Sequence, residues 1–196
     1  MASSGNWFDA AYRGTPPWDI GRPQPAIERL EKTGQITGVV LDVGCGTGEN
    51  VIFLAQRGHD AYGIDGSPTA IGKALAKAKA RGVSAHFDIA DALELQIPET
   101  PFDTVIDSGL FHVFSDAERV RFVKSLSSVI RPGGTYFMMS FSEREPGDWG
   151  PRRVTQQEIR STFGNGWLIN YIEASAFDTT QGRALAWLAS ISRDAR

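Results

Sequence analysis

The stretch LDVGCGTGEN, Leu41–Asn50, follows the apolar pair Val39–Val40 and is the most informative part of the sequence. An apolar run that opens directly into clustered glycines is typical of a buried strand followed by a tight turn and a helix. Acids flank the glycines, with Asp42 before them and Glu49 after them. We therefore expect a ligand-binding turn at the carboxyl end of this strand.

Strands and helices alternate on both sides of this turn. Strands are expected at 38–43, 60–65, 83–88, 102–107 and 135–141, and helices at 26–33, 49–57, 68–81, 115–129 and 155–163. Two further strands, 166–177 and 184–193, are joined by a polar turn that is too short for a parallel return, so they should form a hairpin. The sequence thus predicts an α/β fold with a single Rossmann-like doubly wound sheet, mostly parallel, and a C-terminal antiparallel hairpin.

Length and composition favour one domain in an ordinary globular protein. The chain has 196 residues, 41% hydrophobic and 22% charged, with no low-complexity linker and a formal net charge of -3. This charge argues against a broad nucleic-acid or anionic-membrane surface. A single cysteine, no basic-apolar leader and no membrane-length apolar run indicate a cytoplasmic protein. Residues 1–25 are rich in Gly and Pro and should be mostly irregular.

The glycine spacing differs from that of a dinucleotide site. Gly44, Gly46 and Gly48 are present, but Glu49 occupies the place where the last glycine of G-x-G-x-x-G would stand. A carboxylate at a helix N-terminus competes with phosphate for the positive end of the helix dipole. Asp42, at the end of the strand, should pair with a cationic group or a hydrogen-bond donor of the ligand. A phosphate-free, positively charged nucleoside satisfies both conditions, and S-adenosylmethionine is such a ligand.

Five motifs together resemble those of the class I S-adenosylmethionine-dependent methyltransferases. They are VLDVGCGTGEN, GIDGSP, FDIADAL, FDTVIDSGLFHVF and RPGGTYFMM. The segment PPWDIGRPQPAIERL is similar to the N-terminal part of bacterial small-molecule methyltransferases related to thiopurine and quinolone-type heterocyclic-toxin methyltransferases. The resemblance implies methyl transfer to an O, N or S nucleophile of a small aromatic or heterocyclic molecule. It also implies a lid segment, 1–25, over a core of residues 38–196.

The cofactor residues follow from these motifs. The glycines should bring the backbone close to the methionine end, with Cys45 contributing backbone only. Asp65 should accept the ribose hydroxyls, with Gly66 beside it and Ser67 either on that rim or capping the next helix. Asp91, with Asp88 as its rival, should accept the adenine amino group. The full expected set is Trp18, Asp42, Gly44, Cys45, Gly46, Gly48, Asp65, Gly66, Ser67, Asp91, Ala92, Ser108 and Leu110.

The acceptor should lie beyond the fourth strand, under the N-terminal lid and the loop around residue 150. The expected contacts are Trp18, Arg22, Phe111, His112, Trp149 and Arg152. His112 has an ordinary pKa near 6.5 and is the candidate proton acceptor, with a structural or merely lining role as the alternative. The turn sequence DSGL, in place of an Asn/Asp-Pro-Pro-aromatic motif, argues against methylation of a nucleobase amine. No Cys/His/Asp set has metal-ligand spacing, so no metal is expected.

Two other functions are compatible with a glycine turn of this kind. A nicotinamide-dependent oxidoreductase would bind NAD, and a non-catalytic regulator would bind S-adenosylmethionine without turnover. For the methyltransferase we expect a small-molecule partner, no nucleic acid or membrane, and a monomer or weak homodimer.

Overall fold

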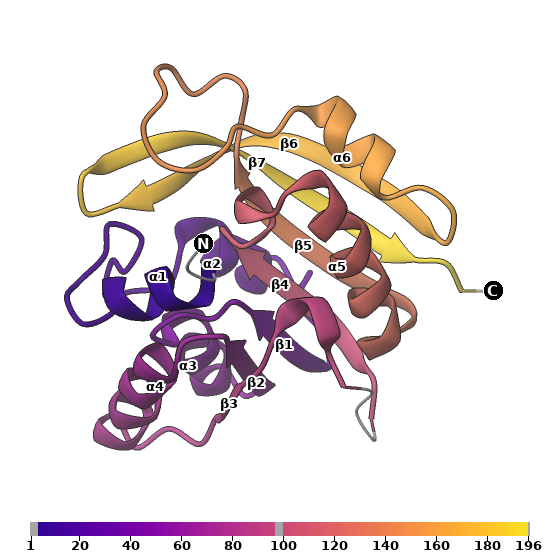
Figure 1. The fold of residues 1–196 in the computed structure, drawn as a ribbon. Helices are drawn as coiled ribbons and strands as arrows, with labels where there is room; N and C mark the ends of the chain where they lie inside the picture. Colours follow the sequence, from indigo (N-terminus) through magenta and orange to yellow (C-terminus); the bar gives the residue numbers. More distant parts are fainter. Residues whose placement is uncertain (1–3, 97–99, 196) are drawn as a thin grey trace.

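The computed structural model describes residues 4–96 and 100–195. Within these residues seven strands form one sheet in the order β3-β2-β1-β4-β5-β7-β6 (Figure 1). Strands β1 to β5 are parallel, whereas β7 runs antiparallel to both β5 and β6. The predicted fold class is confirmed. The strands are β1 Val39–Val43, β2 Asp60–Asp65, β3 His86–Ile89, β4 Phe102–Ser108, β5 Ile130–Phe141, β6 Trp167–Thr179 and β7 Gly182–Arg193.

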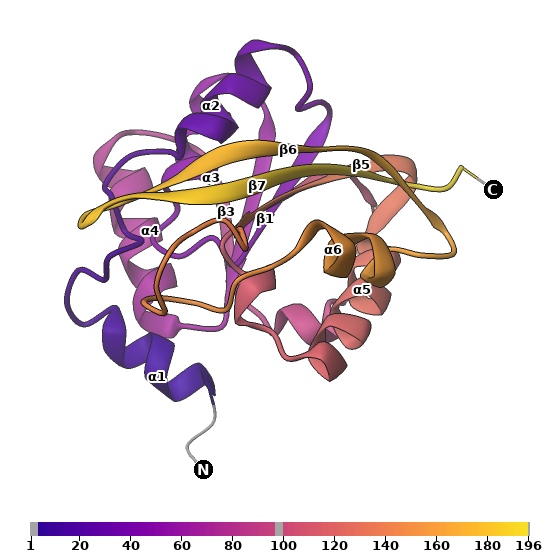
Figure 2. The ribbon, with the colours of Figure 1, turned by 90° about the horizontal axis from the view of Figure 1, so that it is seen from above.

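Helices cover both faces of the sheet. Viewed from above, α2, α3 and α4 lie to one side and α5 and α6 to the other (Figure 2). Helices α5 and α6 begin at the predicted capping boxes, in which Ser115 and Glu118, and Thr155 and Glu158, satisfy each other's backbone N–H groups. The helices are α1 Ser4–Ala11, α2 Pro25–Lys32, α3 Glu49–Gln56, α4 Pro68–Ala80, α5 Asp116–Val129 and α6 Gln156–Thr162, with 3-10 turns η1 Ala92–Glu94 and η2 Phe111–Val113.

Two hydrophobic clusters, one on each face, hold the layers together. Neighbouring residues of one strand point to opposite faces, so Ile106 of β4 packs with α2, α3 and α4 while Val105 packs with α5 and α6. In β5, Met139 packs on the same face as Ile106, and Met138 packs on the same face as Val105. All four are fully buried, as expected for the central strands of a sheet covered on both faces.

One local prediction is wrong and another is incomplete. The N-terminal segment is irregular over 12–24, in line with the expectation of a mostly irregular segment, but it also contains α1. Tertiary contacts stabilise this helix, because Asp9 accepts hydrogen bonds from Ser67 Oγ and Thr69 N at the start of α4. The RPGG turn was expected to precede the fifth strand. It instead lies within β5, where the pairing register with β4 shifts between Phe102 and Thr104.

Among the described residues, none of the helices is both long enough and apolar enough to cross a bilayer.

Candidate active site

The strand order reverses at β1, which has β2 on one side and β4 on the other. In open α/β sheets the ligand crevice lies at the carboxyl ends of the strands at such a switch point. A partly open cavity occurs here. The glycine turn, the N-terminal segment and the β6–β7 hairpin enclose it. Its lining residues are Tyr12, Trp18, Asp19, Ile20, Arg22, Gln24, Gly44, Cys45, Gly46, Thr47, Glu49, Asn50, Ser108 and Phe177.

The three glycines of the turn have different tasks. All have positive φ angles, 74° at Gly44, 54° at Gly46 and 81° at Gly48, which disfavour other residues. Gly44 and Gly46 line the cavity, and close approach of their backbone to the cofactor remains a prediction. Gly48 does not, and a Cβ there would lie 2.7 Å from the Phe87 ring, so this glycine allows α3 to pack against β3. Cys45 also lines the cavity, and burial raises the pKa of its thiol, which leaves it un-ionised.

Asp42, at the end of β1, is buried with one carboxylate oxygen lacking a hydrogen-bond partner in the described part of the chain. Its Oδ2 accepts a 3.3 Å hydrogen bond from Asn50 Nδ2, whereas Oδ1 has none. Burial raises the pKa of this carboxyl group to about 8. Buried polar atoms are almost always partnered, so the orphan oxygen indicates a missing donor or cation. Asp42 does not itself line the cavity, although its partner Asn50 does, so the contact between Asp42 and a positively charged ligand remains a prediction.

Asp65, at the end of β2, is already bonded to the turn. Its carboxylate accepts hydrogen bonds from Gly46 N at 2.9 Å and from Ser67 N at 2.8 Å, and burial raises its pKa. Ser67 takes its alternative role, because its buried hydroxyl caps α4 by accepting from Ala70 N. Ribose binding by Asp65, next to Gly66, remains a prediction.

On the expected adenine side, Asp91 is exposed and caps η1, accepting a hydrogen bond from Leu93 N at 2.9 Å. Ala92 opens that 3-10 turn, and the rival Asp88 is exposed on β3. None of these three lines the cavity. The adenine contact also remains a prediction.

The turn after β4 is organised by Asp107, which sequence reasoning missed. Its carboxylate accepts from Leu110 N at 2.7 Å, Phe111 N at 3.0 Å and Tyr136 Oη at 2.7 Å. Burial raises the pKa of Asp107 to about 7. The turn places Ser108 in the cavity wall and Leu110 against Gly44. The signal that could have found Asp107 is an acid at a strand end, the pattern that singled out Asp42 and Asp65.

Two residues of the same turn contradict their predicted roles. His112 is 5% exposed and does not line the cavity, and its Nδ1 accepts a hydrogen bond from Phe141 N at 3.1 Å. Burial lowers the pKa of His112 to about 3, so the imidazole is too weak a base to accept a proton at neutral pH. Phe111 is fully buried beneath the Arg119 guanidinium, 4.5 Å from its ring centre, and is a core residue rather than an acceptor contact.

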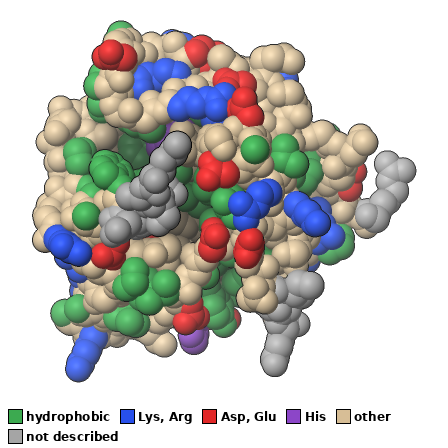
Figure 3. All heavy atoms as spheres, in the orientation of Figure 1, with side chains coloured by type: hydrophobic (Ala, Val, Ile, Leu, Met, Phe, Trp, Pro, Cys, Tyr) green, Lys and Arg blue, Asp and Glu red, His purple; other side chains and the backbone are tan. Residues whose placement is uncertain are grey.

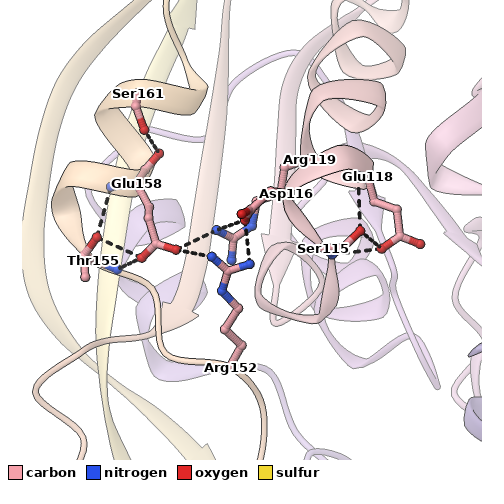
Figure 4. A network of polar contacts seen from close by, with 8 residues as sticks. All are labelled: Ser115, Asp116, Glu118, Arg119, Arg152, Thr155, Glu158 and Ser161. Carbon is pink, nitrogen blue, oxygen red and sulfur yellow. Dashed lines mark hydrogen bonds and ion pairs between the residues drawn. The ribbon is translucent and has the colours of Figure 1, made fainter.

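The loop after β5 is fixed by ion pairs and packing contacts with neighbouring elements. Arg152 pairs with Asp116 at 2.7 Å and with Glu158, which ties the loop to α5 and α6 (Figure 4). Trp149 packs edge-on against Phe141 and donates to Glu145 Oε1. Neither Arg152 nor Trp149 lines the cavity, so their predicted acceptor contacts are not present in this arrangement. For Arg152 the reason is physical, since its guanidinium is engaged by two carboxylates.

The N-terminal segment supplies the residues that sequence reasoning only partly found. Trp18 and Arg22 line the cavity as predicted, with Trp18 Nε1 donating to Tyr12 Oη at 2.9 Å. The turn residue Thr47 donates to Asp19 of this segment at 2.8 Å. Tyr12, Asp19, Gln24, Asn50 and Phe177 also line the cavity and were not predicted.

Glu49 does not act as expected. Its carboxylate pairs with Lys77 at 2.7 Å and Arg81 at 2.8 Å on α4. Burial opposes its ionisation, but the hydrogen bonds from these two cations outweigh that effect and lower its pKa. Because its charge is neutralised, Glu49 alone is no argument against a phosphate ligand.

The strand order and the glycine turn at the switch point define a doubly wound α/β protein with a nucleoside- or nucleotide-binding crevice. Comparison with known proteins agrees: the family described as "Methyltransferase domain" matches residues 40–134. The chain is 36% identical to a 2-heptyl-1-hydroxyquinolin-4(1H)-one methyltransferase of Mycobacteroides abscessus, over 84% of this chain and 78% of that protein. The chain belongs to the S-adenosylmethionine-dependent methyltransferase family.

Two solved structures support this assignment. One, from work on the conversion of a disulfide bond into a thioacetal group during echinomycin biosynthesis, has a TM-score of 0.91 and 39% identity, covering 98% of this chain and 94% of that one. The other is magnesium protoporphyrin IX methyltransferase of Synechocystis with bound S-adenosylmethionine, with a TM-score of 0.67 and 25% identity over 86% of this chain and 76% of that one. The cofactor is S-adenosylmethionine, and the oxidoreductase and regulator alternatives find no support.

Proposed function

We propose that the protein methylates an oxygen or sulfur nucleophile of a small aromatic or heterocyclic molecule and leaves S-adenosylhomocysteine as the second product. The aromatic wall of the cavity carries this proposal. Tyr12 and Trp18 come from the N-terminal segment and Phe177 from β6, and all three line the cavity that contains the glycine turn. Aromatic surfaces of this kind favour a flat, apolar ring.

The relatives favour the same acceptor chemistry. The M. abscessus relative acts on a hydroxyquinolinone, and the echinomycin structure concerns sulfur chemistry at a disulfide. Their sequence identities to this chain, 36% and 39%, are high enough to compare function as well as fold. The hydroxyl of Ser108, buried in the cavity wall without a partner among the described residues, is a polar group that can orient such an acceptor.

The weakness of His112 as a base restricts the acceptor further. None of the three histidines, all within the described residues, lines the cavity. An acceptor that ionises by itself needs no protein base, which favours thiols, with pKa values near 8.5, and acidic hydroxyls over aliphatic alcohols. When bound, S-adenosylmethionine supplies a methyl group already activated by the sulfonium charge. The protein then contributes mainly alignment, worth about 7 to 11 kcal/mol in favourable cases.

The test is a mass-spectrometric screen with four acceptors of matched size: a 1-hydroxyquinolin-4-one, a thiophenol, an aniline and an aliphatic alcohol. We expect methylation of the first two only. Phe177→Ala should raise the KM for the acceptor while the affinity for S-adenosylhomocysteine stays unchanged. Leu168→Ala, on the exposed part of the same strand, serves as the control. Turnover of the alcohol at a comparable rate would contradict the proposal.

We also propose that the protein works in the cytoplasm as a monomer or weak homodimer, with no nucleic-acid or membrane partner. The net charge of -3 and the intermixed acidic and basic side chains on the face seen in Figure 3 argue against a broad nucleic-acid or anionic-membrane surface. Light scattering coupled to gel filtration tests the oligomeric state, and a stable higher oligomer would contradict it.

A further inference from the structure

Gln24 is buried at the point where the N-terminal segment, the glycine-turn helix and the C-terminal hairpin meet. Its backbone N–H donates to Asn50 Oδ1 of α3 at 3.1 Å. Its side-chain amide makes a two-way pair with the backbone of Asp178, donating to the carbonyl oxygen at 2.8 Å and accepting from the N–H at 3.0 Å. The backbone carbonyl oxygen of Gln24 accepts hydrogen bonds from Ile27 N and Glu28 N in the first turn of α2. One residue thus joins four elements of the fold.

The first arm of Gln24 runs through Asn50, which lines the cavity, to Asp42, which lies behind it. Asn50, which accepts from Gln24, donates to Asp42 Oδ2. Asp42 is the carboxylate whose other oxygen lacks a partner among the described residues. A ligand cation that pairs with Asp42 therefore acts on a carboxylate whose orientation is set through Asn50 by Gln24.

The second arm reaches the opposite wall. Asp178 follows Phe177, whose ring lines the cavity and packs 5.6 Å from Phe141. Asp178 is also held by Arg22 at 2.6 Å and by Arg183 at 2.8 Å, so the hairpin tip is fixed to the N-terminal segment at this residue. The side chain of Gln24 is buried between these partners, where unpaired amide groups are costly.

We propose that Gln24 is a positioning residue that couples occupancy of the cofactor end of the cavity to the placement of the β6–β7 hairpin, and with it the Phe177 wall. Because such coupling is reciprocal, a ligand at the acceptor wall strengthens cofactor binding by the same factor. The inference uses the cofactor contact assigned to Asp42, not the identity of the acceptor.

Hydrogen exchange of the Thr180 amide, with and without S-adenosylhomocysteine, measures this coupling. That amide lies in the hairpin turn and donates to Pro17 O, so it reports on the tip without touching Gln24. In the unaltered protein we expect the ligand to slow its exchange about tenfold, within the usual range of coupling between sites. Gln24→Leu keeps the backbone arm to Asn50 and removes both side-chain bonds to Asp178. With the ligand at saturation, the slowing should fall below about twofold.

Gln35→Leu is the matched control, because Gln35 also reaches β6, through Tyr171 Oη at 2.8 Å, but does not line the cavity. In Gln35→Leu, the ligand should slow exchange of the Thr180 amide as much as in the unaltered protein. If Gln24→Leu does not fold, Gln24→Glu retains the acceptor for Asp178 N, loses the donor, and should show an intermediate effect.

Three results would overturn the inference: no slowing in the unaltered protein with ligand bound, full slowing in Gln24→Leu, or equal loss in both leucine variants. Failure of the unaltered protein to bind S-adenosylhomocysteine would instead overturn the cofactor contact and the inference with it.

Discussion

Asp42 offers a quantitative test of the predicted cofactor contact, because burial raises its pKa to about 8 while the ligand expected to pair with it is a cation. The ionised carboxylate is the binding-competent form. Its fraction rises from about one in a hundred at pH 6 to about one half at pH 8, and the apparent Kd scales inversely with that fraction. The affinity for S-adenosylmethionine should therefore increase about fiftyfold between these two pH values.

Isothermal titration calorimetry measures both the affinity and the accompanying proton. At pH 7 the free carboxyl group is about nine-tenths protonated, so binding should release close to one proton per ligand, seen by comparing buffers of different ionisation enthalpy. Asp42→Asn removes the titrating group and should abolish the pH slope. It should also weaken binding about tenfold to hundredfold at pH 8, the cost of one charge-assisted hydrogen bond.

The stability of the ligand-free protein changes in the opposite direction. The folded-state pKa of Asp42 lies above its ordinary value of 3.8, so between about pH 4 and 8 the folded protein binds more protons than the unfolded chain. Its free energy of unfolding should fall as the pH rises through that window, and Asp42→Asn should reduce this fall. Asp88→Asn, at an exposed carboxylate on β3, is the control. A flat affinity from pH 6 to 8 without proton release would refute the reasoning.

Three further substitutions test the site and its supports. His112→Asn keeps an acceptor for the buried Phe141 amide, so turnover should stay within about threefold and the rate should follow the acceptor's own pKa; a loss beyond about a hundredfold would restore the histidine as a base. Gly48→Ala should lower Tm by an amount equivalent to about 1–3 kcal/mol because its Cβ meets Phe87, and Gly82→Ala, with positive φ but open space, should cost less. Arg152→Ala should change stability by under about 1 kcal/mol, since its ion pairs are partly exposed, and leave the KM for the acceptor unaltered; a raised KM would return it to the acceptor site.

Apart from α1 and the start of β5, the order of strands and helices, the hairpin and the glycine turn could be predicted from the sequence. These features depend on interactions between near neighbours: apolar periodicity, glycines at positive φ and capping boxes three residues apart. Asp42 and Asp65 could be placed at one edge of the sheet for the same reason, because parallel strands bring their carboxyl ends together. Asp107, at the end of β4, follows the same pattern but was missed.

The tertiary structure alone decided which side chains face the cavity. Glu49 is neutralised by cations on another helix, and His112 is buried beneath Phe141, so neither has the chemistry that its position in the sequence suggested. Gln24 and Asp178 stand 154 residues apart, yet share two hydrogen bonds beside the acceptor wall. Local patterns carry no information about such pairings, because packing, rather than sequence neighbours, sets the burial and the partners of each group.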